Sequence, residues 1–220
     1  MKDSLWITDI RPTLPEPTPL KESINADIAI IGGGFVGLWS ALMIKERAPE
    51  KRVVILERSF CGAGASGRNG GFVSSWWSRL PFLIDLCGVE EGLKIAQASE
   101  ENIEAIKAFC IDEKIDADFW QSGWIWSATA PSQEGDWDEV LELTKRYGYS
   151  IYHPLSPAQL LKRTGSQLHR SGVVEESNAT LHPAKLVRGL YRVAKARGVE
   201  IFEESEVLKV EQSSPAKLMT

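Results

Sequence analysis

The sequence predicts an α/β fold, mixed with α+β features in its second part, and two patterns carry this prediction. The chain opens on a βαβ pattern, with apolar strands at residues 26–31 and 52–57 and a helix between them that Pro49 ends. Both strands are nearly continuous apolar runs, as strands of a parallel sheet covered on both faces require. Later segments alternate apolar and polar residues, which is typical of half-buried antiparallel strands. We therefore expect a parallel βαβ unit followed by the start of an inserted antiparallel sheet.

The composition is that of a globular protein with one large or two small domains. Hydrophobic residues make up 43% of the 220 residues and charged residues 25%, which permits a packed core. The net charge of −5 and the lack of a basic run argue against nucleic acid as a partner. No segment has the length of a membrane span, and the first apolar run is too glycine-rich for a signal peptide, so we expect a cytoplasmic protein. Three cysteines without a CxxC pair fit a reducing compartment and predict no metal site.

The pattern along the chain divides it into four segments. Prolines stiffen the first segment, which we expect to be an extended arm anchored by Trp6. An amphipathic helix is predicted at residues 89–114, within the third segment. The predicted organisation is an extended N-terminal arm at 1–25, the βαβ domain with a second glycine-rich loop at 26–80, a helical and antiparallel portion at 81–175, and a return to the first domain at 176–220, incomplete at its C-terminal end.

The elements of the later segments have clear signals. Residues 118–130 alternate and are rich in aromatic side chains, which predicts a pair of antiparallel strands. Ser156, which precedes a proline, predicts the start of one helix, and another is expected from Pro183 to Gly198. Two short strands at residues 199–211 complete the pattern.

A GxGxxG motif at Gly32, Gly34 and Gly37 joins the first strand to its helix. The first glycine makes the tight turn, the second lets the backbone approach a pyrophosphate, and the third lets helix and strand pack closely. The helix N-terminus adds free N–H groups and a partial positive charge. Glu57 ends the second strand, where a carboxylate accepts hydrogen bonds from ribose hydroxyls and repels a 2′-phosphate. The spacing predicts a Rossmann-like domain that binds a dinucleotide, FAD or NAD(P).

The segment CGAGASGRNGGF, residues 61–72, distinguishes between these dinucleotides. An NAD domain continues from its second strand into another crossover helix. Here a second glycine-rich loop follows instead, and Ser66, Arg68 and Asn69 supply hydrogen bonds for phosphate, ribityl hydroxyls or a ring edge. The loop favours FAD, and an NAD-dependent dehydrogenase is the less favoured alternative.

With these motifs the sequence resembles the FAD-dependent oxidoreductase family of D-amino-acid oxidase and glycine oxidase, and most of all its gamma-glutamylputrescine oxidase-like branch. The stretches that carry the resemblance are residues 26–46, 53–57, 61–72 and 179–210. Members of this family continue with a further glycine-containing strand and the rest of a substrate domain. The resemblance is therefore to their N-terminal portion, and it implies a fragment of a longer enzyme.

The resemblance implies non-covalent FAD as the cofactor. The first glycine turn would lie at the pyrophosphate, Glu57 and Arg58 beside the adenosine, and the second loop along the ribityl chain toward the isoalloxazine. Val207, in the returning strand, would reach the adenine through its backbone. The cofactor-binding residues implied in this way are Gly32, Gly34, Phe35, Val36, Gly37, Glu57, Arg58, Gly62, Ala65, Ser66, Arg68, Asn69, Gly70, Gly71 and Val207.

The resemblance further implies that a small amine or amino acid is oxidised by hydride transfer from the carbon beside a neutral amine to flavin N5. Such chemistry needs the C–H bond held over the ring, without a metal or a protein nucleophile, so we assign no catalytic acid or base. A non-catalytic flavin- or nucleotide-binding remnant is an alternative of another class, because the glycines and Glu57 would serve binding alone.

Several further residues have a functional and a structural interpretation. Arg68 either stabilises anionic reduced flavin or bonds loop carbonyls. We expect His182 to cap or pack a helix start rather than to catalyse, and Cys61 to pack rather than to attach flavin. A group of tryptophans either lines an amine pocket or forms core, with core favoured: Trp76, Trp77, Trp120, Trp124 and Trp126.

Overall fold

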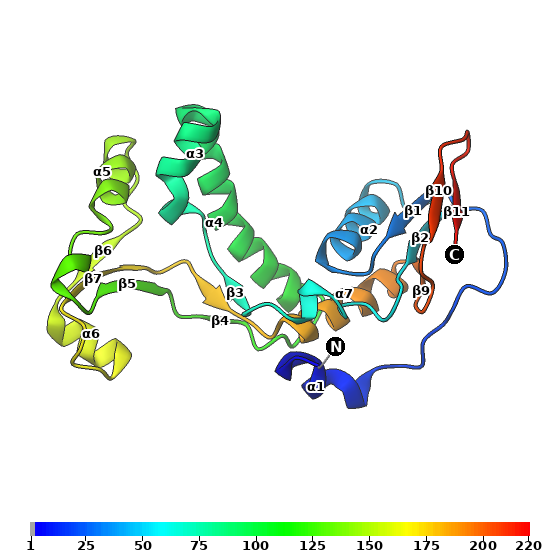
Figure 1. Ribbon diagram of the computed structural model, residues 1–220, viewed down its shortest axis with the longest axis horizontal. Helices are drawn as coiled ribbons and strands as arrows, with labels where there is room; N and C mark the ends of the chain where they lie inside the picture. Colours follow the sequence, from blue (N-terminus) through cyan, green and yellow to red (C-terminus); the bar gives the residue numbers. More distant parts are fainter. Residues whose placement is uncertain (1–2) are drawn as a thin grey trace. The chain divides into compact units, whose positions relative to one another are not determined.

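The computed structural model describes residues 3–220, which form two compact units (Figure 1). The first unit comprises residues 3–71, Cys110–Asp118 and His182–Thr220, and the second comprises Phe72–Phe109 and Phe119–Leu181. Each unit is thus assembled from segments that lie far apart in the sequence. Helices and strands are mixed as the sequence predicts, and the α/β fold class is confirmed.

A three-stranded parallel sheet organises the first unit. Its strands follow the order β1 (Ile28–Ile31), β2 (Val53–Leu56) and β9 (Glu200–Phe202). The central strand β2 is buried at all four positions, which explains its uninterrupted apolar sequence. Helix α2 (Phe35–Arg47) links β1 to β2 and completes the predicted βαβ pattern.

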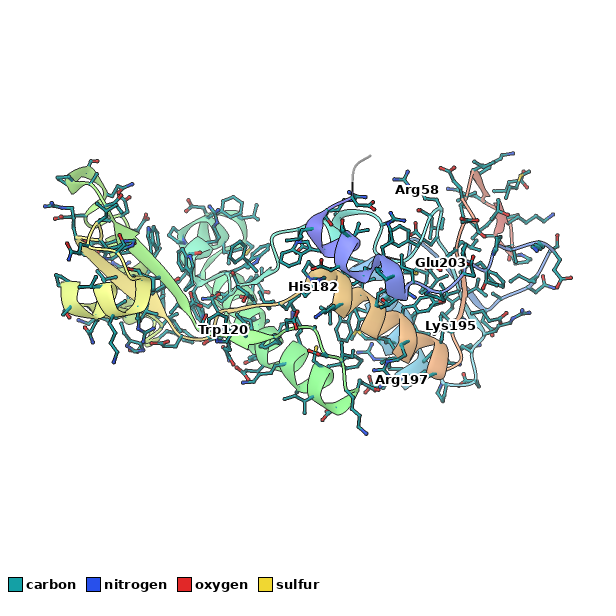
Figure 2. The ribbon with its side chains drawn as sticks, turned by 90° about the horizontal axis from the view of Figure 1, so that it is seen from below. Arg58, Trp120, His182, Lys195, Arg197 and Glu203 are labelled. Atoms are coloured by element: carbon teal, nitrogen blue, oxygen red, sulfur yellow. The ribbon has the colours of Figure 1, made fainter. Side chains whose placement is uncertain are left out.

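Helix α7 (Pro183–Ala196) leads into β9 and packs against α2. It is amphipathic, and its apolar face includes the buried Leu186, Val187 and Leu190. His182 stands at its N-terminal end (Figure 2), where Nδ1 accepts a hydrogen bond from the backbone N–H of Lys185 at 3.2 Å. The prediction that this histidine caps the helix is therefore confirmed. Two short strands, β10 (Lys209–Glu211) and β11 (Lys217–Met219), form an antiparallel pair near the end of the chain.

The N-terminal segment differs from the predicted extended arm. Leu5–Ile10 form helix α1, and Arg11–Thr13 form a 3₁₀ turn. Ser4 caps α1 by accepting a hydrogen bond from the N–H of Ile7, and Ile7 and Ile10 are buried. The first proline of the chain is Pro12, so no proline interrupts residues 4–10. The Ser4 cap and the two buried isoleucines stabilise a helix there. Residues 1–2 of the predicted arm lie outside the described residues.

Trp6 anchors helix α1 within the first unit, as expected. Its indole Nε1–H donates a hydrogen bond to the backbone carbonyl of Asn69 at 2.8 Å. Its ring also meets the ring of His182 edge-on, with 4.8 Å between centroids. Helix α1 therefore contacts both the second glycine loop and the N-terminus of α7 through Trp6.

The second unit contains two small antiparallel sheets. The first has the order β3 (Phe72–Val73), β8 (Ala179–Thr180), β4 (Trp120–Gln121), and the second has the order β5 (Trp124–Ala128), β7 (Ser171–Glu175), β6 (His153–Leu155). The strands β4 and β5 therefore do not pair with each other, and the predicted pairing at residues 118–130 is wrong. Gly123 separates them at a φ of 78°, and its N–H bonds the carbonyl of Asn178 instead. Strands distant in sequence thus supply the partners of both.

The second unit also contains α3 (Leu80–Cys87), α5 (Asp138–Arg146), α6 (Pro157–Thr164) and most of α4 (Val89–Asp112), whose residues 110–112 belong to the first unit. The amphipathic helix predicted at residues 89–114 is α4. Ser156 caps α6, as predicted, and exchanges hydrogen bonds with Gln159 in a capping box. Local capping signals thus locate this helix correctly.

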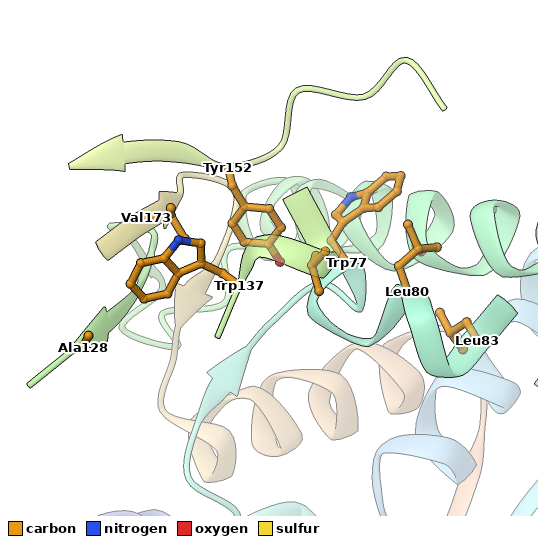
Figure 3. Packing of buried hydrophobic residues seen from close by; sticks show 9 residues of the cluster. Trp77, Leu80, Leu83, Ala128, Trp137, Tyr152 and Val173 are labelled. Carbon is orange, nitrogen blue, oxygen red and sulfur yellow. The ribbon is translucent and has the colours of Figure 1, made fainter. Parts of the chain in front are cut away.

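Trp77 lies in the main hydrophobic cluster of the second unit (Figure 3). Its side chain is completely buried together with Leu80, and the cluster also contains Trp137 and Tyr152. The indole Nε1–H of Trp77 donates to Glu100 at 2.7 Å, which satisfies its polar atom. The core interpretation therefore holds for Trp77, whereas Trp120 is 70% exposed.

Replacing Trp77 by Ala should destabilise the second unit by about 3–5 kcal/mol, because it empties a filled core position. Urea denaturation followed by circular dichroism measures this change. The matched variant Trp120→Ala, at an exposed indole, should cost less than about 1 kcal/mol. Equal shifts for the two variants would contradict the assignment of Trp77 as the core tryptophan.

Candidate dinucleotide site

The two glycine-rich segments of the first unit line one cavity of about 490 Å³. The end of β1 and the first turns of α2 form one side, and the second loop forms the other. Among the predicted cofactor residues, those lining this cavity are Gly32, Gly34, Phe35, Val36, Gly37, Ala65, Ser66 and Asn69. Those that do not line it are Glu57, Arg58, Gly62, Arg68, Gly70, Gly71 and Val207.

The turn from β1 into α2 depends on glycine at two points. Gly32 has a φ of 102°, a backbone conformation that residues with a Cβ rarely adopt. At Gly37 an added Cβ would lie 2.0 Å from the carbonyl oxygen of Gly32. The helix can therefore start this close to the strand only because position 37 lacks a side chain.

The N-terminus of α2 faces the cavity with Gly34 as its N-cap. N–H groups in the first turn of a helix have no intrahelical acceptor, and the helix dipole adds partial positive charge. The N–H of Phe35 donates to the side-chain hydroxyl of Ser66 at 2.9 Å. This hydrogen bond joins the second loop to the helix start, so the two predicted motifs form one site suited to an anionic ligand.

Glu57 lies behind this turn, at the end of β2. Its carboxylate accepts the N–H of Gly33 at 2.7 Å and the N–H of Ser59 at 3.0 Å. A carboxylate offers about four acceptor positions, so two remain for further donors such as ribose hydroxyls. The neighbouring Arg58 is exposed (Figure 2).

The second loop is held in shape by its own polar groups. The Nε–H of Arg68 donates to the carbonyl of Ala63 at 2.7 Å, which supports the structural interpretation of this arginine. Asn69 donates through Nδ2 to the carbonyls of Ala65 and Ser66 and accepts the N–H of Gly71. The loop is therefore an ordered wall of the cavity and not a flexible linker.

Gly62 and Cys61 connect this loop to the rest of the first unit. The N–H of Gly62 donates to the carbonyl of Gly33 at 3.1 Å, which adds a second link between the two loops. The N–H of Cys61 donates at 2.7 Å to Glu203, a carboxylate only 2% exposed (Figure 2). Burial raises the pKa of the Cys61 thiol, and the negative charges of Glu203 and Glu57 raise it further. The thiol stays protonated, in agreement with a packing role.

Val207 does not lie in a strand, which corrects the prediction of a returning strand at this position. Strand β9 ends at Phe202, and Val207 lies in the loop between β9 and β10. The reason is a change of partners, because the N–H of Glu204 bonds the carbonyl of Ser59 and that of Ser205 bonds the carbonyl of Glu57. These bonds take the chain across the end of β2 rather than along it.

Three residues of the cavity wall were missed by the sequence analysis: Ile30, Ile31 and Ser40. Ser40 lies four residues after Val36, on the same face of α2, so helical spacing from the glycine motif could have found it. The two isoleucines carry no such signal, because apolar residues at the end of a strand are equally consistent with core.

The parallel βαβ sheet and the joined glycine loops are the features of a flavin-type dinucleotide-binding protein. The chain belongs to the family described as DAO, FAD-dependent oxidoreductase, whose model matches residues 27–218. The predicted family and its cofactor, FAD, are therefore confirmed. No helix in residues 3–220 is long and apolar enough to cross a membrane.

The relatives of this chain support the same family assignment. The chain is 31% identical to the probable oxidoreductase OrdL of Haemophilus influenzae, covering 86% of this chain and 44% of the relative. It is 30% identical to the gamma-glutamylputrescine oxidoreductase of Escherichia coli, covering 91% and 47%. Glycine oxidase from Geobacillus kaustophilus has a similar fold, with a TM-score of 0.72 and 20% identity over 88% of this chain and 50% of that one. The chain spans about half the length of the curated relatives it matches.

Treating the native protein with iodoacetamide near pH 8 should label Cys87 and leave Cys61 unmodified. Cys87 is exposed, whereas Cys61 is completely buried and its raised pKa disfavours the reactive thiolate. Mass spectrometry of the digested protein identifies the labelled thiols, with urea-unfolded protein as the control in which both react. Labelling of Cys61 at the rate of Cys87 would contradict the described loop packing.

Proposed function

We propose that this chain is the FAD-binding portion of an oxidoreductase that oxidises a C–N bond of a small amine or amino acid. The observation that carries the proposal is the single cavity lined by both glycine loops, in a chain of an FAD-dependent family. An NAD site requires only the first loop, whereas a second ordered loop directly after Glu57 gives additional binding surface for the flavin half of FAD.

The residues that line the cavity, together with Glu57 behind the first turn, fit the parts of FAD. The glycine turn and the positive end of the α2 dipole suit the pyrophosphate, and the two open acceptor positions of Glu57 suit ribose hydroxyls. The second loop, with Ser66 and Asn69, would follow the ribityl chain. When bound, the flavin supplies the electron sink, accepting hydride at N5.

The chain itself contributes a second loop whose polar side chains and charged Arg68 are already held in position. Hydrogen bonds inside the second loop fix Asn69 and Arg68 before any ligand arrives, so little ordering is needed on binding. The names of the relatives, gamma-glutamylputrescine oxidoreductase and glycine oxidase, support an amine or amino acid as the substrate. A chain spanning half of such relatives could also bind FAD without turnover, which is the second candidate function.

Incubating the purified chain with FAD and removing unbound flavin should leave a protein with flavin absorbance between about 300 and 550 nm. Adding small amines and amino acids without oxygen should then bleach this absorbance, because electrons pass to the flavin. Absence of bound flavin after FAD addition would contradict the proposal. Flavin that is bound but never bleached would favour the non-catalytic candidate.

A further inference from the structure

We propose that the second unit contains a binding site for an organic ammonium ion. The site is a cavity of about 290 Å³, distinct in its residues from the dinucleotide cavity of the first unit. Its lining includes three buried polar residues, Ser75, Glu175 and Asn178, together with the aromatic side chains of Phe72 and Trp124.

Glu175 is a carboxylate at the end of β7. Its side chain is only 2% exposed, and one oxygen, Oε1, accepts hydrogen bonds from the hydroxyls of Ser75 and Ser177. Among residues 3–220 no lysine, arginine or histidine pairs with it, whereas the adjacent exposed Glu176 pairs with Arg163. A buried carboxylate is costly unless a counter-charge compensates it. The structure therefore leaves a place for a cation beside Glu175.

The hydrogen bonds around Glu175 indicate which of its atoms is available. The oxygen of Ser75 accepts the N–H of Trp77 at 3.3 Å, so its own proton is free to point to Glu175. The hydroxyls of Ser75 and Ser177 both donate to Oε1, and neither donates to Oε2. Burial, followed by the charge of Glu175, raises the pKa of Tyr152, so that phenol stays neutral and supplies no charge of its own.

Asn178 adds a donor that lacks an acceptor. The residue is 3% exposed, and its Oδ1 accepts the N–H of Ser75 at 2.8 Å, which fixes the orientation of the amide. Its Nδ2 is buried and has no hydrogen-bond partner within residues 3–220. A buried, unpaired donor in a cavity wall calls for an acceptor on a ligand. The ligand is thus expected to carry an oxygen acceptor as well as its ammonium group.

The aromatic side chains of the cavity, like Glu175, favour a cationic ligand. Phe72 is 76% exposed and Trp124 is 38% exposed, so part of each side chain is open to a ligand. Aromatic faces attract ammonium ions through the ring quadrupole and give no such attraction to anions. The cavity therefore combines one buried negative charge, one free donor and aromatic surface.

As a subsite for an amine substrate, this inference rests on the proposed function. The amine that is oxidised must be neutral, so the ammonium held by Glu175 would be another amino group of the same molecule. The binding site itself requires neither flavin nor turnover. Its test can therefore fail while the flavin experiment succeeds, and the reverse also holds.

The test is isothermal titration calorimetry of the 220-residue chain without added flavin, using n-butylammonium and, as a neutral molecule of similar shape, 1-butanol. We expect n-butylammonium to bind and 1-butanol to bind at least about tenfold more weakly, because the pairing of a cation with the buried carboxylate outweighs the hydroxyl oxygen that 1-butanol offers to Asn178. In Glu175→Gln, which keeps the shape and the acceptor oxygen, ammonium binding should weaken at least about tenfold. The control Glu176→Gln removes the same charge from the next residue and should bind like the unmodified chain.

Absence of n-butylammonium binding, equal binding of the two probes, or unchanged binding in Glu175→Gln would each overturn the proposal. Thermal unfolding of the unmodified chain gives a measurement that does not depend on a variant folding. There n-butylammonium at saturating concentration should raise the midpoint, because a ligand bound to the folded state stabilises it. A midpoint raised equally by 1-butanol would contradict a site for a cation.

Discussion

The carboxylate of Glu57 holds the dinucleotide site together. It stands at the end of the buried strand β2 and accepts the N–H of Gly33 from the first loop and of Ser59 from the entry to the second. The hydrogen bonds from Gly62 to Gly33 and from Phe35 to Ser66 then join the two loops directly. Each bond pairs a backbone donor that would otherwise be unsatisfied, so the two bonds to Glu57 and the two direct links together fix the arrangement of both loops.

Features with local causes could be predicted from the sequence. The βαβ pattern, the glycine turn at Gly32, the cap at Ser156 and the cap at His182 depend on residues within a few positions of one another. Both glycine loops were predicted to serve one ligand, and they line one cavity. Ser40 was within reach of the same reasoning, because helical spacing alone places it beside Val36.

Features that depend on distant partners could not be predicted. The strands β4 and β5 follow one another in sequence but pair with β8 and β7, so their hydrogen bonds depend on residues roughly 40 to 60 positions away. Val207 leaves the sheet because residues after Phe202 bond the backbone of Glu57 and Ser59. The same limit applies to Glu175 and Asn178, whose burial in one cavity no local pattern indicates.

Two buried carboxylates show how the units differ. Glu203 in the first unit lies 3.5 Å from the guanidinium of Arg188 and accepts the N–H of Cys61, so its charge is compensated within the fold. Glu175 in the second unit has only hydroxyl donors among the described residues. The first carboxylate is thus structural, and the second is the one whose surroundings call for a ligand.

The affinity for FAD, measured by quenching of flavin fluorescence on binding, tests the central role of Glu57 most directly. Glu57→Gln should weaken binding by about tenfold, because the amide loses charge-assisted acceptance and replaces one acceptor by a donor. Glu50→Gln removes the same charge at an exposed position and should bind FAD as the unmodified chain does. Equal affinity in all three proteins would contradict the account of how the two loops form one cofactor site.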